Sequence, residues 1–88
     1  MTDVYFFKSP TCGPCKRFMP VVMSAVTDLD LPLIVTDVSK APDFAKEHNV
    51  TAVPTLIVMT EGEEPQELYR LVGATTKAEL VDLLRSFS

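Results

Sequence analysis

The chain has 88 residues, of which 47% are hydrophobic, so it is just long enough for one core without extra cross-links. Its 8 basic and 12 acidic residues give a net charge of −4, which argues against nucleic acid or an anionic membrane as partner. No apolar stretch approaches the roughly 20 residues of a membrane span, and no basic segment precedes an apolar run as in a secretory leader. We therefore expect one domain over residues 1–88, monomeric and cytoplasmic.

The first predicted element is a buried central strand over Val4–Phe7, a β-branched and aromatic run that ends at Lys8-Ser9-Pro10. A helix is predicted from Pro14 onward, because apolar residues recur with the spacing of one helical face. These residues are Cys15, Phe18, Met19, Val22, Met23, Val26 and Leu29. The pattern places both Met19 and Met23 in the core. Pro20 lies inside this helix and removes one N–H group, so we expect a kink there.

The only two cysteines, Cys12 and Cys15, lie where this strand gives way to the helix. A Cys-x-x-Cys spacing at a helix start brings two thiols within disulfide reach. Free N–H groups and the helix dipole at the N-terminal edge are expected to lower the pKa of Cys12, which becomes the attacking nucleophile. Cys15, inside the first turn, is then the resolving thiol that closes the disulfide. Lys16 adds a positive charge beside the pair.

Two other uses of the cysteines are less favoured. Structural zinc usually takes four protein ligands, and beyond the cysteines only His48 is a typical donor of nitrogen or sulfur. A purely structural disulfide is disfavoured because a two-residue spacer constrains the unfolded chain little. A single close pair is typical of a catalytic disulfide in a reducing compartment. We therefore expect no metal and no cofactor beyond the redox-active pair Cys12-Cys15.

A second strand is predicted over Leu31–Val38, with Leu33-Ile34-Val35 as the core of the strand. The next helix opens at Ser39 or at Ala41-Pro42. It ends before Asn49, a residue suited to a left-handed cap.

Thr55–Met59 is predicted as the third strand and Glu67–Val72 as the fourth, with a hairpin turn over Glu61–Pro65 between them. Thr76 begins the last helix and forms a capping box with Glu79. The apolar face of this last helix consists of Leu80, Leu83, Leu84 and Phe87. The order β-α-β-α-β-β-α implies a parallel first pair of strands and an antiparallel last pair.

Four landmarks of the sequence together resemble the thioredoxin family. Cys12-Gly13-Pro14-Cys15-Lys16 matches the family's active-site motif, and Pro20 matches the proline five residues beyond its second cysteine. Val53-Pro54-Thr55 matches the family's cis-proline step, and Leu71-Val72-Gly73-Ala74 resembles the segment before its last helix. The resemblance runs from about Val4 to the end of the chain.

The resemblance implies an α/β fold, the minimal four-stranded mixed sheet flanked by three helices. It also implies a dithiol carrier that reduces protein disulfides and is itself reduced by a flavin-dependent thioredoxin reductase using NADPH. The expected substrate-binding residues are Gly13, Pro14, Val53, Pro54, Gly73 and Ala74. Thr11 and Lys16 flank the motif as auxiliary residues. A cis Val53-Pro54 bond would place the main chain of Val53 beside the disulfide, where it could pair with an extended substrate.

Three departures from the family pattern stand out. We expect the additional N-terminal strand and helix of an ordinary thioredoxin to be missing, as in glutaredoxins, because the sequence starts only a few residues before its first strand. Thr11 replaces the usual tryptophan, so that Lys8-Ser9-Pro10-Thr11 resembles a glutaredoxin loop. Phe6 replaces the buried aspartate that serves the resolving thiol in proton transfer, which leaves water or another carboxylate for that role.

Other functions therefore stay open. One is a glutaredoxin-like dedicated electron donor, for example to ribonucleotide reductase. Gly13-Pro14 in place of Pro-Tyr, and the lack of a glutathione-binding segment after Gly73, favour protein disulfides over glutathione. Another is a redox-idle binding subunit of a larger assembly. A third, a disulfide oxidase or isomerase, is disfavoured by the same Gly-Pro dipeptide.

Overall fold

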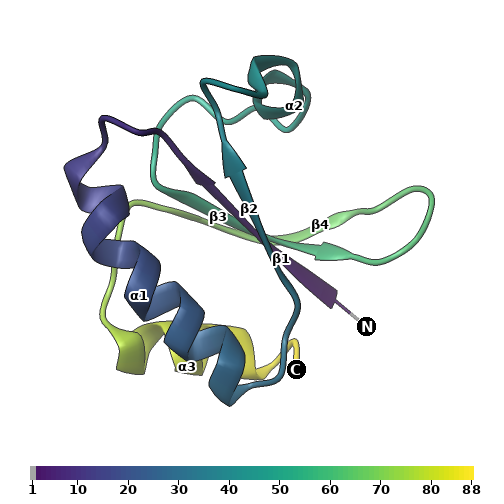
Figure 1. Cartoon of the computed structure of the whole chain (residues 1–88). Coiled ribbons are helices and arrows are strands. Elements are labelled where there is room, and N and C mark those ends of the chain that lie inside the picture. The colour runs from purple at the N-terminus through teal and green to yellow at the C-terminus, as the bar shows by residue number, and fades with distance from the viewer. Residues whose placement is uncertain (1) are drawn as a thin grey trace.

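The computed structural model describes residues 2–88 and contains four strands and three helices (Figure 1). In chain order they are β1 (Thr2–Lys8), α1 (Gly13–Asp28), β2 (Leu33–Asp37), α2 (Pro42–Glu47), β3 (Thr55–Thr60), β4 (Glu67–Val72) and α3 (Lys77–Arg85). This order confirms the predicted β-α-β-α-β-β-α arrangement.

The strands form one mixed sheet in the order β2-β1-β3-β4. Strand β1 runs parallel to β2 and antiparallel to β3, and β3 runs antiparallel to β4. The prediction of a central first strand is confirmed, because Val4, Phe6 and Phe7 of β1 have no exposed surface. A strand with neighbours on both edges and packing on both faces tolerates apolar residues at successive positions.

Helices cover both faces of the sheet (Figure 1). On one face, Val4 and Phe6 of β1 share a hydrophobic cluster with Phe18 and Val22 of α1 and with α3. On the other face, Phe7 and Ile57 pack against Ala45 of α2. The alternation of side chains along β1 thus divides the core into two clusters.

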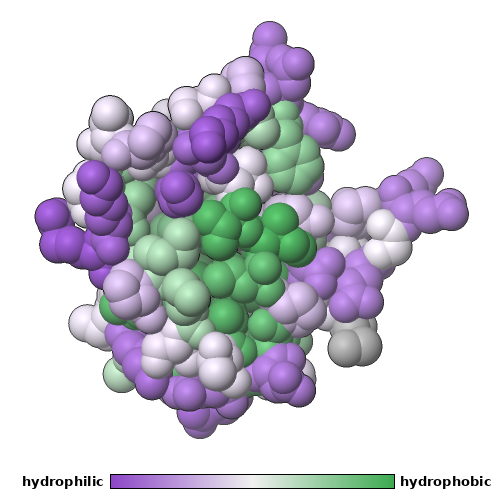
Figure 2. Space-filling model, viewed as in Figure 1, coloured by the Kyte–Doolittle hydropathy of each residue, from purple (hydrophilic) through white to green (hydrophobic). Residues whose placement is uncertain are grey.

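Strand β2 is an exposed edge strand, and it contains Leu33-Ile34-Val35, the predicted core of the second strand. Ile34 is 37% exposed and Val35 41% exposed, and only Leu33 packs partly against the core. The physical reason is that β2 pairs with β1 on one side only. Figure 2, in the same view as Figure 1, shows hydrophobic residues gathered near the centre of this face, where β2 runs.

The prediction that Met23 is a core residue is wrong, since its side chain is 54% exposed. Successive residues of an α-helix are rotated by about 100° around the helix axis. The buried face of α1 is centred between Cys15, Val22 and Val26, so Met23 lies at its outer flank. Met19 is closer to that centre and packs partly buried against the core, as predicted. Helix α1 continues through Pro20 to Asp28.

Several predicted ends of helices are present. Asn49, just after α2, has φ of 56°, the left-handed conformation expected of a cap. The Thr76 hydroxyl caps α3 by accepting a 3.2 Å hydrogen bond from the Glu79 N–H. The Glu79 carboxylate does not complete a capping box but accepts a hydrogen bond from the Thr75 hydroxyl.

The two ends of the described chain are joined by a hydrogen bond. The Thr2 hydroxyl donates it to the Phe87 carbonyl over 2.7 Å, which links the start of β1 to the residues after α3.

Within residues 2–88, none of the helices has both the length and the apolar character needed to traverse a bilayer.

Candidate active site

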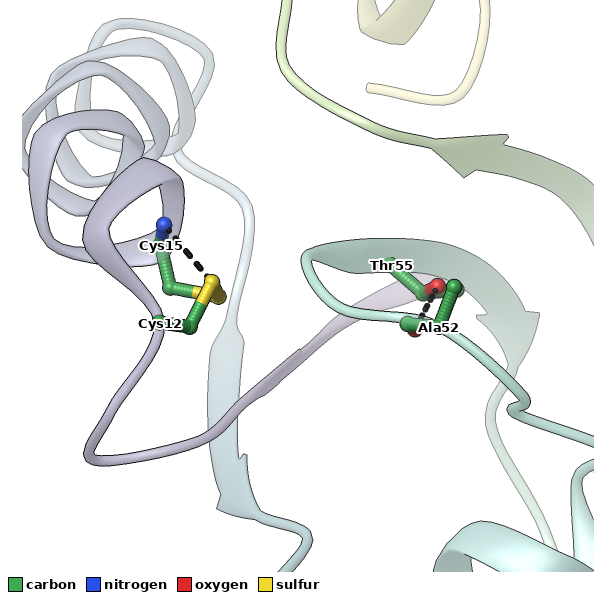
Figure 3. The surroundings of a disulfide bond; sticks show 4 residues. All are labelled: Cys12, Cys15, Ala52 and Thr55. Carbon is green, nitrogen blue, oxygen red and sulfur yellow. Dashed lines mark hydrogen bonds between the residues drawn. A yellow bond between two sulfur atoms is a disulfide. The ribbon is translucent and has the colours of Figure 1, made fainter.

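Cys12 and Cys15 form a disulfide at the start of α1, with Cα atoms 5.2 Å apart. Cys12 is the N-cap of the helix, and its Sγ accepts a 3.1 Å hydrogen bond from the Cys15 N–H (Figure 3). In the reduced protein the same N–H, at the positive end of the helix, would stabilise negative charge on Cys12 Sγ.

The two sulfur-bearing residues differ in their access to a partner. Cys12 is half-buried, whereas Cys15 is only 1% exposed. A second molecule can therefore reach Cys12 but not Cys15. This asymmetry is what a nucleophile followed by a shielded resolving thiol requires.

The loop that follows β1 leads directly to Cys12. Lys8 ends β1 beside Asp37 of β2, and the Cys12 N–H donates a 3.3 Å hydrogen bond to the Ser9 carbonyl. Thr11 is exposed immediately before Cys12, and Lys16 is exposed immediately after Cys15. The two predicted auxiliary residues thus lie on the solvent side of the disulfide.

The segment before β3 faces the disulfide (Figure 3). The Val53–Pro54 peptide bond is cis, and Pro54 is buried. The Thr55 hydroxyl donates a 2.7 Å hydrogen bond to the Ala52 carbonyl, which closes the turn over these residues. Thr55 pairs with Phe7 of β1, so the turn is held at the end of β1 from which the cysteine loop begins.

The segment after β4 completes the surroundings of the disulfide. The Gly73 N–H donates a 2.8 Å hydrogen bond to the Pro54 carbonyl, and Gly73 has φ of 95°. Ala74 lines a cavity of about 220 Å³ together with Pro14, Arg17, Phe18, Val21 and Thr75. The structure therefore brings Gly13 and Pro14, Val53 and Pro54, and Gly73 and Ala74 to one end of the sheet.

Phe6 is not ionisable, although the resemblance to the thioredoxin family implies a buried aspartate at its position. Its ring has no exposed surface and packs edge-on against Phe18, with centroids 5.9 Å apart. Cys15 instead borders a second cavity, of about 270 Å³. This cavity is lined by Lys8, Ser9, Pro10, Cys15, Lys16 and Met19. Cys15 thus borders an open space whose lining residues include no carboxylate.

Arg17 is a residue of this region that the sequence interpretation missed. A Cβ placed on Gly13 would lie 3.4 Å from Nη1 of Arg17, so the guanidinium lies over the turn between the two cysteines. The signal was available, because residues four apart on a helix are neighbours and Gly13 precedes Arg17 by four.

No group of three or more His, Cys, Asp or Glu side chains suited to a metal ion occurs between Thr2 and Ser88. His48, the one remaining nitrogen donor considered for zinc, packs edge-on against Phe44 beside α2, with centroids 4.6 Å apart.

Comparison with known proteins gives consistent results. The sequence model of the Thioredoxin family matches residues 3–86. Thioredoxin H2 of Arabidopsis thaliana is 36% identical over 69 residues, which are 77% of this chain and 50% of that protein. A thioredoxin of Mycobacterium tuberculosis is 38% identical over 77 residues, which are 85% of this chain and 64% of that protein. The chain thus spans half to somewhat under two thirds of the length of these relatives.

Solved structures agree in the fold. A mutant thioredoxin from Halobacterium salinarum superposes with a TM-score of 0.88 at 28% identity, covering 98% of this chain and 74% of that one. This likeness confirms the predicted α/β fold with its four-stranded mixed sheet and three helices. Together with the family match over residues 3–86, it shows that the chain belongs to the thioredoxin family.

Proposed function

We propose that this chain is a thiol–disulfide oxidoreductase that reduces protein disulfides through Cys12 and Cys15. The observation that carries the proposal is the asymmetry of the pair: Cys12 is accessible at the N-cap, and Cys15 is 1% exposed behind it. A structural cross-link has no need of one accessible sulfur with an N–H donor aimed at it.

In the proposed reaction the Cys12 thiolate attacks one sulfur of a substrate disulfide. A mixed disulfide forms, and the other substrate sulfur leaves as a thiolate that takes up a proton. The Cys15 thiol loses its proton, attacks Cys12 Sγ and releases the second substrate thiol. The substrate gains two electrons and two protons, and the chain ends with the Cys12–Cys15 disulfide.

Water is the proposed acceptor of the Cys15 proton. Phe6 cannot take up a proton, and the space of about 270 Å³ beside Cys15 is large enough for several water molecules. Lys8 and Lys16 also line this space, and no acidic side chain does.

An extended substrate segment is proposed to lie across the residues around Cys12. Pro54 has no N–H group of its own, so the main chain of Val53 is the proposed pairing group for the substrate. The small residues Gly13, Gly73 and Ala74 and the exposed ring of Pro14 allow the two main chains to approach closely.

The electron source and the redox group are proposed from the resemblance to the thioredoxin family. A flavin-dependent thioredoxin reductase using NADPH is the proposed source of electrons, and the pair Cys12-Cys15 is the proposed redox group without further cofactor. We propose that residues 1–88 form one thioredoxin-like domain that acts as a monomer in the cytoplasm, since the two cysteines fit a reducing compartment.

Reduction of insulin disulfides by dithiothreitol tests the proposal. The wild-type protein should accelerate the reaction well above dithiothreitol alone, and Cys12→Ser should abolish the acceleration. Cys15→Ser, reduced beforehand and then mixed with insulin in the absence of dithiothreitol, should accumulate a mixed disulfide that is visible on a non-reducing gel. Unchanged biological activity in the Cys12→Ser, Cys15→Ser double variant would instead support a redox-idle binding subunit.

The reduction potential of the pair, measured against glutathione, distinguishes the glutaredoxin-like donor. A low potential with rapid insulin reduction supports a general protein disulfide reductase. A high potential with slow insulin turnover would favour a dedicated donor, for example to ribonucleotide reductase.

A further inference from the structure

The charges around the disulfide are opposite in sign to the charge of the whole chain. The net charge is −4, yet the three segments that surround the disulfide, residues 8–17, 50–54 and 71–76, contain no Asp or Glu. They contain three basic residues, Lys8, Lys16 and Arg17. We call these three residues the basic collar.

The basic collar lies on both sides of the cysteine turn. Lys8 and Lys16 line the cavity beside Cys15. Arg17 lines the other cavity, between Pro14 and Ala74, and its guanidinium lies over Gly13. A partner whose disulfide approaches Cys12 therefore meets a positive charge on either side of the cysteine turn.

Within residues 2–88, the charges of Lys16 and Arg17 are not neutralised by ion pairs. The two ion pairs of this part of the chain join Arg70 to Glu67 and Lys77 to Asp28. Lys8 is partly compensated by Asp37, which pairs with it across β1 and β2. A hydrogen bond from the Ser39 hydroxyl, and more weakly the charge of Lys8, lower the pKa of Asp37. Lys16 and Arg17 therefore carry most of the effect on a partner.

The acidic residues accumulate elsewhere. Glu61, Glu63 and Glu64 are exposed in the β3–β4 turn, which projects away from the start of α1 (Figure 1). Such a separation of charge orients a charged partner during its approach and raises the association rate.

We propose that the basic collar makes the protein prefer substrate disulfides flanked by aspartate or glutamate. This inference rests on the proposed function, since it names the substrate class of the same site. Lys16 and Arg17 act as specificity-determining residues that pair with carboxylates of the bound substrate.

Three disulfide peptides that differ only in the two residues flanking one cysteine test the proposal. These residues are Glu-Glu, Gln-Gln or Lys-Lys, and kcat/KM for reduction by the wild-type protein is measured for each. At low ionic strength the acidic peptide should be reduced roughly tenfold faster than the neutral one, at the lower end of electrostatic steering, and the basic peptide more slowly. The preference should fade towards about 1 M salt, where the Debye length is about 3 Å.

The decisive quantity is the ratio of kcat/KM for the acidic peptide to that for the neutral one. Lys16 also lies next to Cys15, but a change in thiol reactivity affects all three peptides equally and cancels in the ratio. Lys16→Gln, Arg17→Gln should bring the ratio close to one, and Lys16→Glu, Arg17→Glu should invert it.

A matched control removes two positive charges far from the disulfide. Lys46→Gln, Arg85→Gln changes the net charge by the same amount, on exposed positions of α2 and α3. The ratio should stay at its wild-type value in this variant. An equal fall in both double variants would overturn the basic collar in favour of a net-charge effect.

The two proposals fail in different ways. Reduction of the neutral peptide without any preference for the acidic one would refute the basic collar and leave the proposed function intact. Failure of the wild-type protein to reduce any of the three peptides would refute the proposed function.

Discussion

The Gly73 N–H donates a 2.8 Å hydrogen bond to the carbonyl of Pro54. This bond continues the pairing of Thr55 with Val72 by one step beyond the ends of β3 and β4. It joins the segment before β3 to the segment before α3, and both face the cysteines. The spacing between the two proposed substrate-binding segments is therefore set by the sheet.

Gly73→Ala should lower both stability and substrate affinity. Gly73 has φ of 95°, and no atom lies within 4 Å of the position of a Cβ. The cost is thus backbone strain, of about 1–3 kcal/mol. Because relief of that strain displaces the hydrogen bond to Pro54, KM for a disulfide peptide should rise. Urea unfolding and peptide reduction measure the two effects.

Gly62→Ala is the matched control for this variant. Gly62 has φ of 125° and equally open surroundings, but it lies in the β3–β4 turn. A comparable loss of stability with unchanged KM is expected. If KM rose equally in both variants, the hydrogen bond to Pro54 would have no role of its own in binding.

Phe6→Ala should destabilise the protein by about 3–5 kcal/mol. Its ring is fully buried against Phe18, and its removal leaves a cavity between β1 and α1. Met23→Ala truncates another large apolar side chain that is 54% exposed, and it should change the free energy of unfolding by no more than about 0.5 kcal/mol. Equal losses in the two variants, measured by denaturant unfolding, would contradict this assignment of the core.

The ion pair of Glu67 with Arg70 should make stability depend on pH in the acid range. Hydrogen bonds from Arg70, and then its charge, hold the pKa of Glu67 below its usual value. The stabilisation is therefore complete above the pKa of unfolded Glu67 and is lost as the pH falls through the lowered folded pKa. Because the pair is partly exposed and screened, Glu67→Gln should cost roughly 0.2–1 kcal/mol at pH 7. The wild-type and variant unfolding curves should converge in acid.

Arg70→Gln should cost more than Glu67→Gln and should keep part of its cost in acid. Arg70 also donates hydrogen bonds of 2.6 Å and 3.2 Å to the carbonyls of His48 and Asn49, and carbonyls do not titrate in this range. Amide exchange of Val50, which follows this segment, should become faster in Arg70→Gln. Unchanged exchange there would show that the two carbonyl contacts contribute little.

Thr76→Ala should destabilise the protein by about 1 kcal/mol through loss of the cap on α3. Thr76→Ser retains a hydroxyl acceptor and should restore most of the stability. A similar loss in both variants would assign the effect to the methyl group of Thr76 instead.

Local patterns in the sequence predicted most of the fold. Hydrophobic periodicity located the strands and helices, and Asn49 and Thr76 marked helix ends correctly. The sequence could not reveal that β2 lies at the edge of the sheet, since strand order depends on contacts between distant segments. As a result of this edge position, Ile34 and Val35 are each more than one third exposed.

The candidate site, like the fold, could be predicted only in part from local patterns in the sequence. Cys12 and Cys15 were found from their spacing, and Val53-Pro54 and Gly73-Ala74 from a family resemblance. Spacing alone cannot bring such distant segments of the chain into contact, and that step required the sheet register. Arg17 escaped notice because its role depends on where its side chain lies relative to Gly13.

The hydrogen bond between Thr2 and Phe87 has a practical consequence for handling the protein. It holds the beginning and the end of the described chain together, away from the start of α1 (Figure 1). Either end can carry a fusion partner or an attachment to a solid support while the disulfide stays open to solvent. A short linker between the two ends would also permit circular permutation, with new termini in the exposed turn that contains Gly62.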